Sequence, residues 1–368
     1  MRNFVERLNP YDGTCLEGRI PSLDGLRCVA VLCVLLAHGW YSLKIPEPLM
    51  DYRHPYGVLG VTIFFVLSGF LIYNLTYKEI CKNGKFNWKA FYLRRILRIF
   101  PCFYFYLFVV LIISLLGYYI VTWQILVSTA TFTYNYQQLW YLTHPKQNDF
   151  HVVAQYWTLS LEEQFYLLWP LLVLLIFRKN LQTALLIAIF AAPILRVFTY
   201  FFIPEWRGQL MMMAHTGFDS IAAGVLLGEW MVRKRSKKIL VAVAENPWSI
   251  WLSFLFLFLF SPSLKVAFQG SYNLTIGATM DFIAIGILII AVIRQKNSLA
   301  YRFLNWAPVM LIGTLSYSLY IWNPLFLYKN SIFPFNLFPF NYIMVFFAAC
   351  FSYFVVERPF LRLKEKIY

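Results

Sequence analysis

The sequence predicts an all-α membrane protein, a polytopic bundle of about ten transmembrane helices with both termini in the cytoplasm. Hydrophobic residues make up 60% of the 368 positions and charged residues only 13%, against roughly 45–50% and 25% in ordinary globular domains. Ten apolar stretches come close to the length of about 20 residues that a helix needs to cross a bilayer. Lysine and arginine are enriched in alternate loops, as the positive-inside rule requires.

The ten stretches follow one another along nearly the whole chain. The first 20 residues are polar and contain no signal-peptide core, so we expect the first stretch to remain as a membrane anchor. The predicted spans are 24–43, 57–77, 99–121, 156–177, 181–203, 209–232, 247–268, 273–293, 306–328 and 338–356. Residues 1–368 are therefore predicted to form a single integral-membrane domain with no separate soluble domain. The aromatic stretch 122–155 is expected to cap the helices on the outer side.

The distribution of basic residues supports this topology. Of the 32 Lys and Arg residues, 24 lie in segments predicted to be cytoplasmic, 6 in outer loops, Lys265 among them, and the last two, Arg27 and Arg196, inside spans. The net charge of +15 is therefore attributed to inner loops and not to nucleic-acid binding. The six cysteines show no CxxC pair and no zinc-like spacing with histidine, so no metal site is predicted.

The first span carries ionisable residues, which are costly in lipid and usually face a partner or a wet cavity. Arg27 and His38 are 11 residues apart. That spacing is close to three helical turns, so both side chains lie on one face with a rise of roughly 16 Å between them. We expect Arg27 near the inner surface and His38 deeper, toward the outer leaflet. The simpler alternatives are lipid headgroup contact for Arg27 and a packing role for His38.

The fourth span reads QYWTLSLEEQFYLLWP and enters from the outer side, which places Glu162 and Glu163 one or two turns below the outer surface. A carboxylate at the depth of His38 could orient its imidazole and support its action as a base. We therefore hypothesise that these glutamates contact His38. The simpler alternative is that one of them reaches interfacial water.

The sequence FYLRRILRIFP places Arg94, Arg95 and Arg98 where the cytoplasmic surface meets the bilayer, between a basic inner loop (78–98) and the third span. The guanidinium fork suits phosphate, which favours a phosphate-bearing soluble cosubstrate. Contact with anionic lipid headgroups is the alternative.

Further polar and small residues lie inside spans. Arg196 is expected to form a structural pair with an aspartate in the bundle. His215 and Asp219 share a helical face at i, i+4, a weak indication of a metal site. In GVTIFFVLSGFLIY, Ser68 and Gly69 are interpreted as packing residues that let helices approach closely, in preference to a serine nucleophile.

Six separated segments carry a family resemblance. They are RIPSLDGLRCVAVLCVLLAHGW, GVTIFFVLSGFLI, RRILRIFP, YWTLSLEEQFYLLWP, LIGTLSYSLYIW and VVERPF, in that order from about Ile20 to Phe360. With these motifs the chain resembles the acyltransferase family 3 membrane proteins, which include bacterial O-acetyltransferases of surface polysaccharides. The resemblance extends over nearly the whole chain.

The resemblance implies roles for particular residues. It implies that acyl-CoA, usually acetyl-CoA, is the donor on the cytoplasmic side, with no permanently bound cofactor. It also implies that Arg27 and His38 are the essential pair and that the arginines of the RRxxR motif help to hold CoA. Glu162 occupies the family's more regular glutamate position.

The chain departs from the family pattern at two positions. The family typically has a histidine where Asn323 stands in SYSLYIWNP. Asparagine donates and accepts hydrogen bonds but does not titrate, so an acid–base role is lost there and an acceptor-binding role stays open. The family often has an arginine where Gly217 stands, which weakens the prediction of an Arg–Asp pair formed there with Asp219. Glu163, Asp219 and Asn323 are candidates for substrate binding.

Together these features predict a membrane acyltransferase in the bacterial inner membrane, with acyl-CoA, a hydroxyl acceptor and the lipid bilayer as partners and no nucleic acid. It would move an acetyl group to a cell-surface glycan such as lipopolysaccharide O-antigen, capsule or exopolysaccharide. The CoA phosphates would lie on the arginine cluster, and His38 would act as general base or carry the acyl group itself. The alternatives are a multi-pass transporter of a small polar or anionic solute, since buried charges also mark transport paths, and a catalytically inactive relative.

Overall fold

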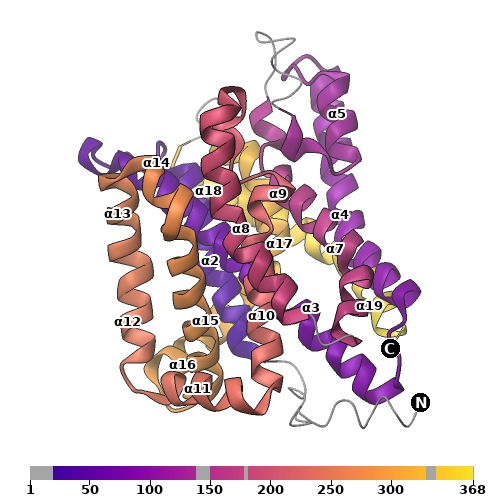
Figure 1. Ribbon diagram of the computed structural model, residues 1–368. Coiled ribbons are helices and arrows are strands. Elements are labelled where there is room, and N and C mark those ends of the chain that lie inside the picture. Colours follow the sequence, from indigo (N-terminus) through magenta and orange to yellow (C-terminus); the bar gives the residue numbers. More distant parts are fainter. Residues whose placement is uncertain (1–19, 138–149, 178–180, 329–336, 368) are drawn as a thin grey trace.

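The computed structural model describes residues 20–137, 150–177, 181–328 and 337–367, and every regular element in these ranges is helical (Figure 1). The α-helices are α2 Pro21–Gly39, α3 Arg53–Asn83, α4 Trp88–Leu115, α5 Trp123–Ala130, α7 Tyr156–Phe177, α8 Leu181–Phe202, α9 Ala214–Gly217, α10 Asp219–Val232, α11 Lys234–Glu245, α12 Ser249–Leu255, α13 Ser261–Ala267, α14 Gln269–Tyr272, α15 Ala278–Arg294, α16 Leu299–Leu304, α17 Ala307–Leu327, α18 Phe340–Phe351 and α19 Arg358–Glu365. Short 3-10 helices are η1 Glu47–Tyr52, η2 Tyr134–Tyr136, η3 Phe150–Val153 and η4 Pro204–Gln209. The π-helical turns η5 Phe256–Phe260, η6 Asn273–Gly277 and η7 Ser352–Glu357 join α12 to α13, α14 to α15 and α18 to α19.

The all-α membrane architecture is confirmed. Within the described ranges, eight helices are long and apolar enough to cross a membrane. They correspond to eight of the ten predicted spans. A ninth, 156–177, coincides with α7. The chain is thus an integral membrane protein, while the count of ten and the cytoplasmic termini stay predictions.

The predicted continuous span 209–232 is wrong. Its first part is divided between the end of η4 and the four-residue helix α9, and Phe218 separates α9 from α10. Because α10 alone has 14 residues, it is shorter than the usual spanning length of about 20 residues. The break places Asp219 at the first position of α10 instead of in the middle of a long helix.

The predicted loop 78–98 is also shorter than expected. Helix α3 runs on to Asn83, where Gly84 takes the left-handed conformation (φ 69°) and its N–H donates to Ile80 O at 2.8 Å. Helix α4 begins again at Trp88, after Asn87 accepts a hydrogen bond from the N–H of Ala90. The helices continue beyond the apolar core because their polar ends remain good helix formers in water. The three arginines of the RRxxR motif therefore lie on a helix and not in a loop.

Helices α2, α3, α10 and α17 form the closely packed centre of the bundle. The contact between α3 and α10 depends on glycine. A Cβ atom added to Gly69 would lie 2.0 Å from Ile221 O, and one added to Gly224 would lie 2.1 Å from Val66 O. Absence of a side chain lets the two backbones touch, as in other membrane helix pairs. The prediction of a packing role is confirmed for Gly69.

Two buried ion pairs link the centre to flanking helices. Arg196 on α8 pairs with Asp219 on α10, and both side chains are almost fully buried. This confirms the predicted structural Arg196–Asp pair and identifies the aspartate. Lys265 on α13 pairs with Asp281 on α15 at 2.6 Å. The assignment of Lys265 to an outer loop is therefore wrong, since the helix extends through it and the aspartate offsets the cost of burying its charge.

The segments that connect or follow the long helices lie at the two ends of the bundle. Helices α11, α16 and α19 lie at one end, and α5 and α14 lie at the opposite end (Figure 1). The first three come from segments predicted to be cytoplasmic, and α5 belongs to the stretch 122–155 predicted to be external. This separation agrees with the alternation of basic loops along the sequence.

Candidate active site

Two cavities lie among the central helices, and the predicted site residues are divided between them. The first, which we call the arginine cavity, has a volume of about 550 Å³. Its lining includes six cationic side chains and two carboxylates, namely Arg27, Lys78, Arg94, Arg95, Arg98, Lys364, Asp24 and Glu162. Cationic groups therefore outnumber carboxylates three to one, which suits a multiply charged anion.

The arginines of this cavity differ in how they are held. Arg27 pairs with Asp24 on its own helix at 2.8 Å, and Arg94 pairs with Glu79 at 2.6 Å. Arg95 stacks over the ring of Tyr166, with its guanidinium carbon 4.0 Å from the ring centroid. In the described part of the chain, neither Arg95 nor Arg98 has a carboxylate within ion-pair distance. These two guanidinium groups keep their hydrogen-bonding capacity for a ligand.

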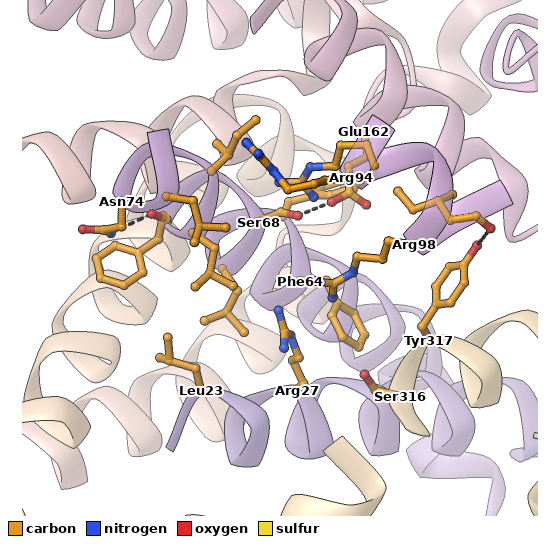
Figure 2. A pocket seen from close by; sticks show the side chains of 18 of the residues that line it. Leu23, Arg27, Phe64, Ser68, Asn74, Arg94, Arg98, Glu162, Ser316 and Tyr317 are labelled. Carbon is orange, nitrogen blue, oxygen red and sulfur yellow. Dashed lines mark hydrogen bonds between the residues drawn. The ribbon is translucent and has the colours of Figure 1, made fainter. Parts of the chain in front are cut away.

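Glu162 belongs to a hydroxyl cluster in the same cavity. It accepts hydrogen bonds from Ser68 on α3 and from Tyr166 one turn further along α7, and the two hydroxyl oxygens are 2.6 Å apart. Figure 2 shows the Ser68–Glu162 bond beside Arg27 and Arg98, which extend into the cavity from α2 and α4. The cluster connects Glu162 to Arg95 through the ring of Tyr166.

The second cavity, which we call the histidine cavity, has a volume of about 980 Å³ and contains His38. Its lining is mixed, with aromatic, amide and oppositely charged groups that come from the helix ends and from the segments around η2 and η4. Two cations and two carboxylates line it, namely Arg53, Arg207, Glu205 and Asp219. Its equal numbers of cations and carboxylates distinguish this cavity from the arginine cavity.

His38 is held by Asn323 of α17. The Nδ1 atom of His38 is hydrogen-bonded to Oδ1 of Asn323, while Nδ2 of Asn323 donates to Tyr320 O at 2.7 Å and to Leu319 O at 3.3 Å. These two carbonyls orient the amide, so its oxygen faces the imidazole. An amide oxygen only accepts, which requires Nδ1 of His38 to carry the proton. In the neutral ring, Nε2 is then the nitrogen with a free lone pair.

The two cavities meet at a partition formed by Val61, Phe65 and Tyr320, which line both of them. The ring of Tyr320 packs edge-on against Phe64, with centroids 6.0 Å apart. Its hydroxyl lies 2.8 Å from the hydroxyl of Thr158. Arg27 lies on one side of the partition and His38 on the other, so one face of α2 contributes to two adjoining cavities.

The predicted contact between the glutamates and His38 is wrong. Glu162 lines the arginine cavity and bonds to Ser68 and Tyr166, whereas His38 lines the histidine cavity and bonds to Asn323. Glu163 lines neither cavity, and its Oε1 has no hydrogen-bond partner among the described residues. The depth expected from the sequence did not identify the partner of His38, because α17 lies against α2 and supplies that partner.

The remaining candidates for substrate binding are engaged within the protein. Asp219 lines the histidine cavity, but Arg196 occupies its carboxylate. Asn323 is fully buried and lines neither cavity. It positions His38 instead of facing a substrate.

Some site residues were not identified from the sequence. Lys364 on α19 lines the arginine cavity although it lies in the C-terminal tail. Ser68 was interpreted as a packing residue, yet its hydroxyl is bonded to Glu162. The aromatic stretch 122–155 was expected to cap the helices, and its residues Tyr134 and Gln137 do line the histidine cavity. Residues 138–149 of that stretch lie outside the described ranges.

Comparison with known proteins places this arrangement in a family. The sequence model of an acyltransferase domain, that of acyltransferase family 3, matches residues 20–357. The chain belongs to this family. The family match includes α2 to α18, so it covers the histidine cavity, the partition and all of the arginine cavity's lining except Lys364.

Curated relatives in the family have modest sequence identity. O-acetyltransferase OatA of Staphylococcus aureus (strain NCTC 8325 / PS 47) is 26% identical over 366 residues, which cover 92% of this chain and 57% of the relative. Peptidoglycan O-acetyltransferase OatA of Listeria monocytogenes is 29% identical over 326 residues, covering 83% of this chain and 49% of the relative. The chain thus spans about half the length of these relatives. No solved structure matches it.

Proposed function

We propose that this protein transfers an acetyl group from acetyl-CoA, bound in the arginine cavity, to a hydroxyl of a cell-surface glycan, bound in the histidine cavity. The observation that carries the proposal is the pair of unlike cavities that meet at Val61, Phe65 and Tyr320. A transferase of this kind needs separate places for an anionic donor and a hydroxyl acceptor, with a reactive group where they meet. Membership of an acyltransferase family supports the reaction type.

The donor side is supported by the unpaired arginines. CoA carries several phosphate charges, and charge-assisted hydrogen bonds from guanidinium to phosphate are among the stronger polar contacts in proteins. Within the described ranges, Arg95 and Arg98 present such groups without a competing carboxylate, and Lys364 lines the same cavity. Glu162 positions Ser68 and Tyr166, and through Tyr166 it supports the stacked Arg95.

The acceptor side is supported by the orientation of His38. Its free Nε2 can take the proton of an acceptor hydroxyl as that oxygen attacks the thioester carbonyl. The tetrahedral intermediate then expels the CoA thiolate, which recovers the proton from the imidazolium. In the alternative covalent route, Nε2 attacks the thioester carbonyl first and the C–S bond breaks, which releases CoA thiolate. The glycan hydroxyl then attacks the acetyl-imidazolium, the C–N bond breaks to restore the neutral imidazole, and the hydroxyl proton passes to the thiolate.

The thioester arm would cross the partition. Arg27 and His38 are separated by 11 residues of one helix, α2, and the helical rise over that distance is roughly 16 Å. The pantetheine part of CoA is a thin, extended chain that would pass Val61, Phe65 and Tyr320 while the phosphates remain on the arginines. Acetyl-CoA would then be used from the cytoplasmic face without leaving it.

The class of glycan acceptor that we propose is based on a curated relative. Because the Listeria monocytogenes relative is a peptidoglycan O-acetyltransferase, we favour peptidoglycan over lipopolysaccharide, capsule or exopolysaccharide as the glycan acceptor. The protein would then act in the cytoplasmic membrane with the histidine cavity open to the outer side.

The proposal is tested by reconstituting the purified chain in lipid nanodiscs with acetyl-labelled acetyl-CoA. Glycan strands of peptidoglycan freed of O-acetyl groups serve as one acceptor and lipopolysaccharide as the other. We expect label on the peptidoglycan strands and none with the His38→Ala variant. Equal labelling by wild type and variant, or no labelling of any glycan by the wild type, would refute the proposed function.

A further inference from the structure

Two buried amide oxygens in the histidine cavity have no hydrogen-bond partner among the described residues. They are Oε1 of Gln155 and Oε1 of Gln209. Both residues line this cavity, and their exposed fractions are only 2% and 8%. A buried acceptor without a donor is costly, and most such atoms in proteins are satisfied.

The orientation of Gln155 is set by the protein. Its side-chain Nε2 donates to Ile321 O on α17 at 3.0 Å, and its backbone carbonyl oxygen accepts a hydrogen bond from the hydroxyl of Thr158 at 2.8 Å. Turning the amide over would place Oε1 against the oxygen of Ile321. The unpaired oxygen is therefore the result of a fixed side chain. Ile321 is two residues from Asn323, which positions His38.

Gln209 approaches the cavity from a different part of the chain. It is the last residue of η4, in the segment where the expected long span is interrupted. Its buried oxygen and that of Gln155 thus come from segments more than 50 residues apart in the sequence, yet they line one cavity.

A third glutamine in the same cavity shows what a satisfied amide looks like. Oε1 of Gln137 accepts a hydrogen bond from Ser128 at 3.2 Å. The cavity therefore contains both kinds of amide, and the unpaired oxygens are specific to Gln155 and Gln209. A ligand able to satisfy them must bring O–H or N–H donors into a space bounded partly by aromatic rings such as that of Trp157. Saccharides have this combination of hydroxyl donors and apolar ring faces.

We infer that Gln155 and Gln209 form the acceptor subsite, where their amide oxygens accept hydrogen bonds from saccharide hydroxyls next to the one that is acetylated. This inference rests on the proposed function and adds to it the residues that recognise the glycan. The cavity volume of about 980 Å³ lies at the upper end of the range of roughly 300–1,000 Å³ typical of ligand sites. His38 and the two oxygens would contact one bound sugar unit or two adjacent units.

The test compares Gln155→Met, Gln209→Met and the double variant with wild type in nanodiscs. Methionine keeps the length of the side chain and removes the acceptor. Gln124→Met is the matched control, since Gln124 lies on α5 and lines neither cavity. The measured quantities are KM for de-O-acetylated peptidoglycan strands, KM for acetyl-CoA and kcat.

We expect each single variant to raise the KM for glycan about threefold to tenfold, the usual effect of one neutral hydrogen bond. The double variant should raise it further, while the KM for acetyl-CoA and the properties of Gln124→Met stay at wild-type values. If the wild type transfers acetyl groups and the double variant has the glycan KM of Gln124→Met, the subsite assignment is overturned and the proposed function stands. A parallel rise in the KM for acetyl-CoA also overturns it. If the wild type transfers no acetyl group to the glycan, the proposed function and the subsite assignment are both overturned.

Discussion

The arginine cavity and the histidine cavity lie on the same helices, α2 and α3, but their chemistry differs. Cations outnumber carboxylates three to one around the first, whereas charges balance around the second and amide groups from several segments reach it. An excess of charge selects an anion through long-range attraction. Fixed amides select by hydrogen-bond geometry. The contrast indicates that one bundle binds two substrates of different kinds and brings them together at the partition.

The largest effect is expected at the point where the two chemistries meet. His38→Ala removes the only group we assign to proton transfer, and general acid–base catalysis contributes about 10²–10⁴-fold to rates. We expect kcat for acetyl transfer to fall about 10³-fold while acetyl-CoA still binds, because the arginine cavity is untouched. Equilibrium binding of acetyl-CoA and initial rates measure the two quantities. A His38→Ala protein with normal turnover would mean that the histidine cavity is not the reaction site.

The next largest effect is expected from the two arginines that give the arginine cavity its excess of positive charge. Replacing Arg95 and Arg98 together by methionine removes two unpaired donors, and hydrogen bonds to charged groups are worth about 1.5–3 kcal/mol each. We expect kcat/KM for acetyl-CoA to fall about 100-fold or more. The affinity for acetyl-CoA should also depend less on salt concentration in the double variant than in the wild type.

The matched control for this pair is Arg362→Met. Arg362 is an exposed arginine of α19 and lines neither cavity. It should leave acetyl-CoA binding as in the wild type. If Arg362→Met and the double variant weaken binding equally, the general positive charge of the protein and not the cavity holds the donor.

A smaller effect is expected from the residue that orients the base. Asn323→Leu leaves Nδ1 of His38 without its acceptor and frees the other tautomer, and an unpaired buried donor costs about 1–3 kcal/mol. We expect kcat to fall about 10- to 100-fold with little change in either KM. Asn323→His should recover part of the rate, since an imidazole nitrogen can also accept from Nδ1. A loss expressed only in the glycan KM would instead assign Asn323 to acceptor binding.

The smallest effect is expected on the donor side at Glu162. Glu162→Gln keeps an acceptor for Ser68 and Tyr166 but removes the charge, and a charge-assisted hydrogen bond is about twice as strong as a neutral one. We expect the KM for acetyl-CoA to change a few-fold, with the KM for glycan unaffected. A change confined to the glycan KM would place Glu162 on the acceptor side, against the two-cavity arrangement.

Much of the fold could be predicted because lipid imposes simple demands on sequence. A helix such as Ala307–Leu327 is recognisable from its length and apolar content alone. The predicted helix boundaries were wrong where they depend on contacts between helices, which the sequence does not show. Lys265 was placed in a loop because its partner Asp281 is 16 residues away on another helix. The interruption before Asp219 was not recognised, because the four residues of α9 contain no proline that would mark a helix break.

The site was predictable in its residues and not in their pairing. Arg27, His38 and the RRxxR arginines stand out as charges in or beside apolar segments, and all of them line the two cavities. Asn323 was a candidate for substrate binding and not for pairing with His38, because depth along a helix gives no information about which neighbour faces it. Unpaired oxygens such as that of Gln155 are a property of packing alone.

In the proposed reaction, the thioester passes from the arginine cavity to His38 across the partition. Val61→Trp, which fills the junction lined by Val61, would block this passage, and Val61→Ala is the partner variant that leaves it open. Acetyl-CoA binding and acetyl transfer are measured on the same nanodisc samples. We expect Val61→Trp to bind acetyl-CoA close to wild-type affinity but to transfer no acetyl group, while Val61→Ala does both. A Val61→Trp protein that binds acetyl-CoA and acetylates glycan at the wild-type rate would contradict this passage across the partition.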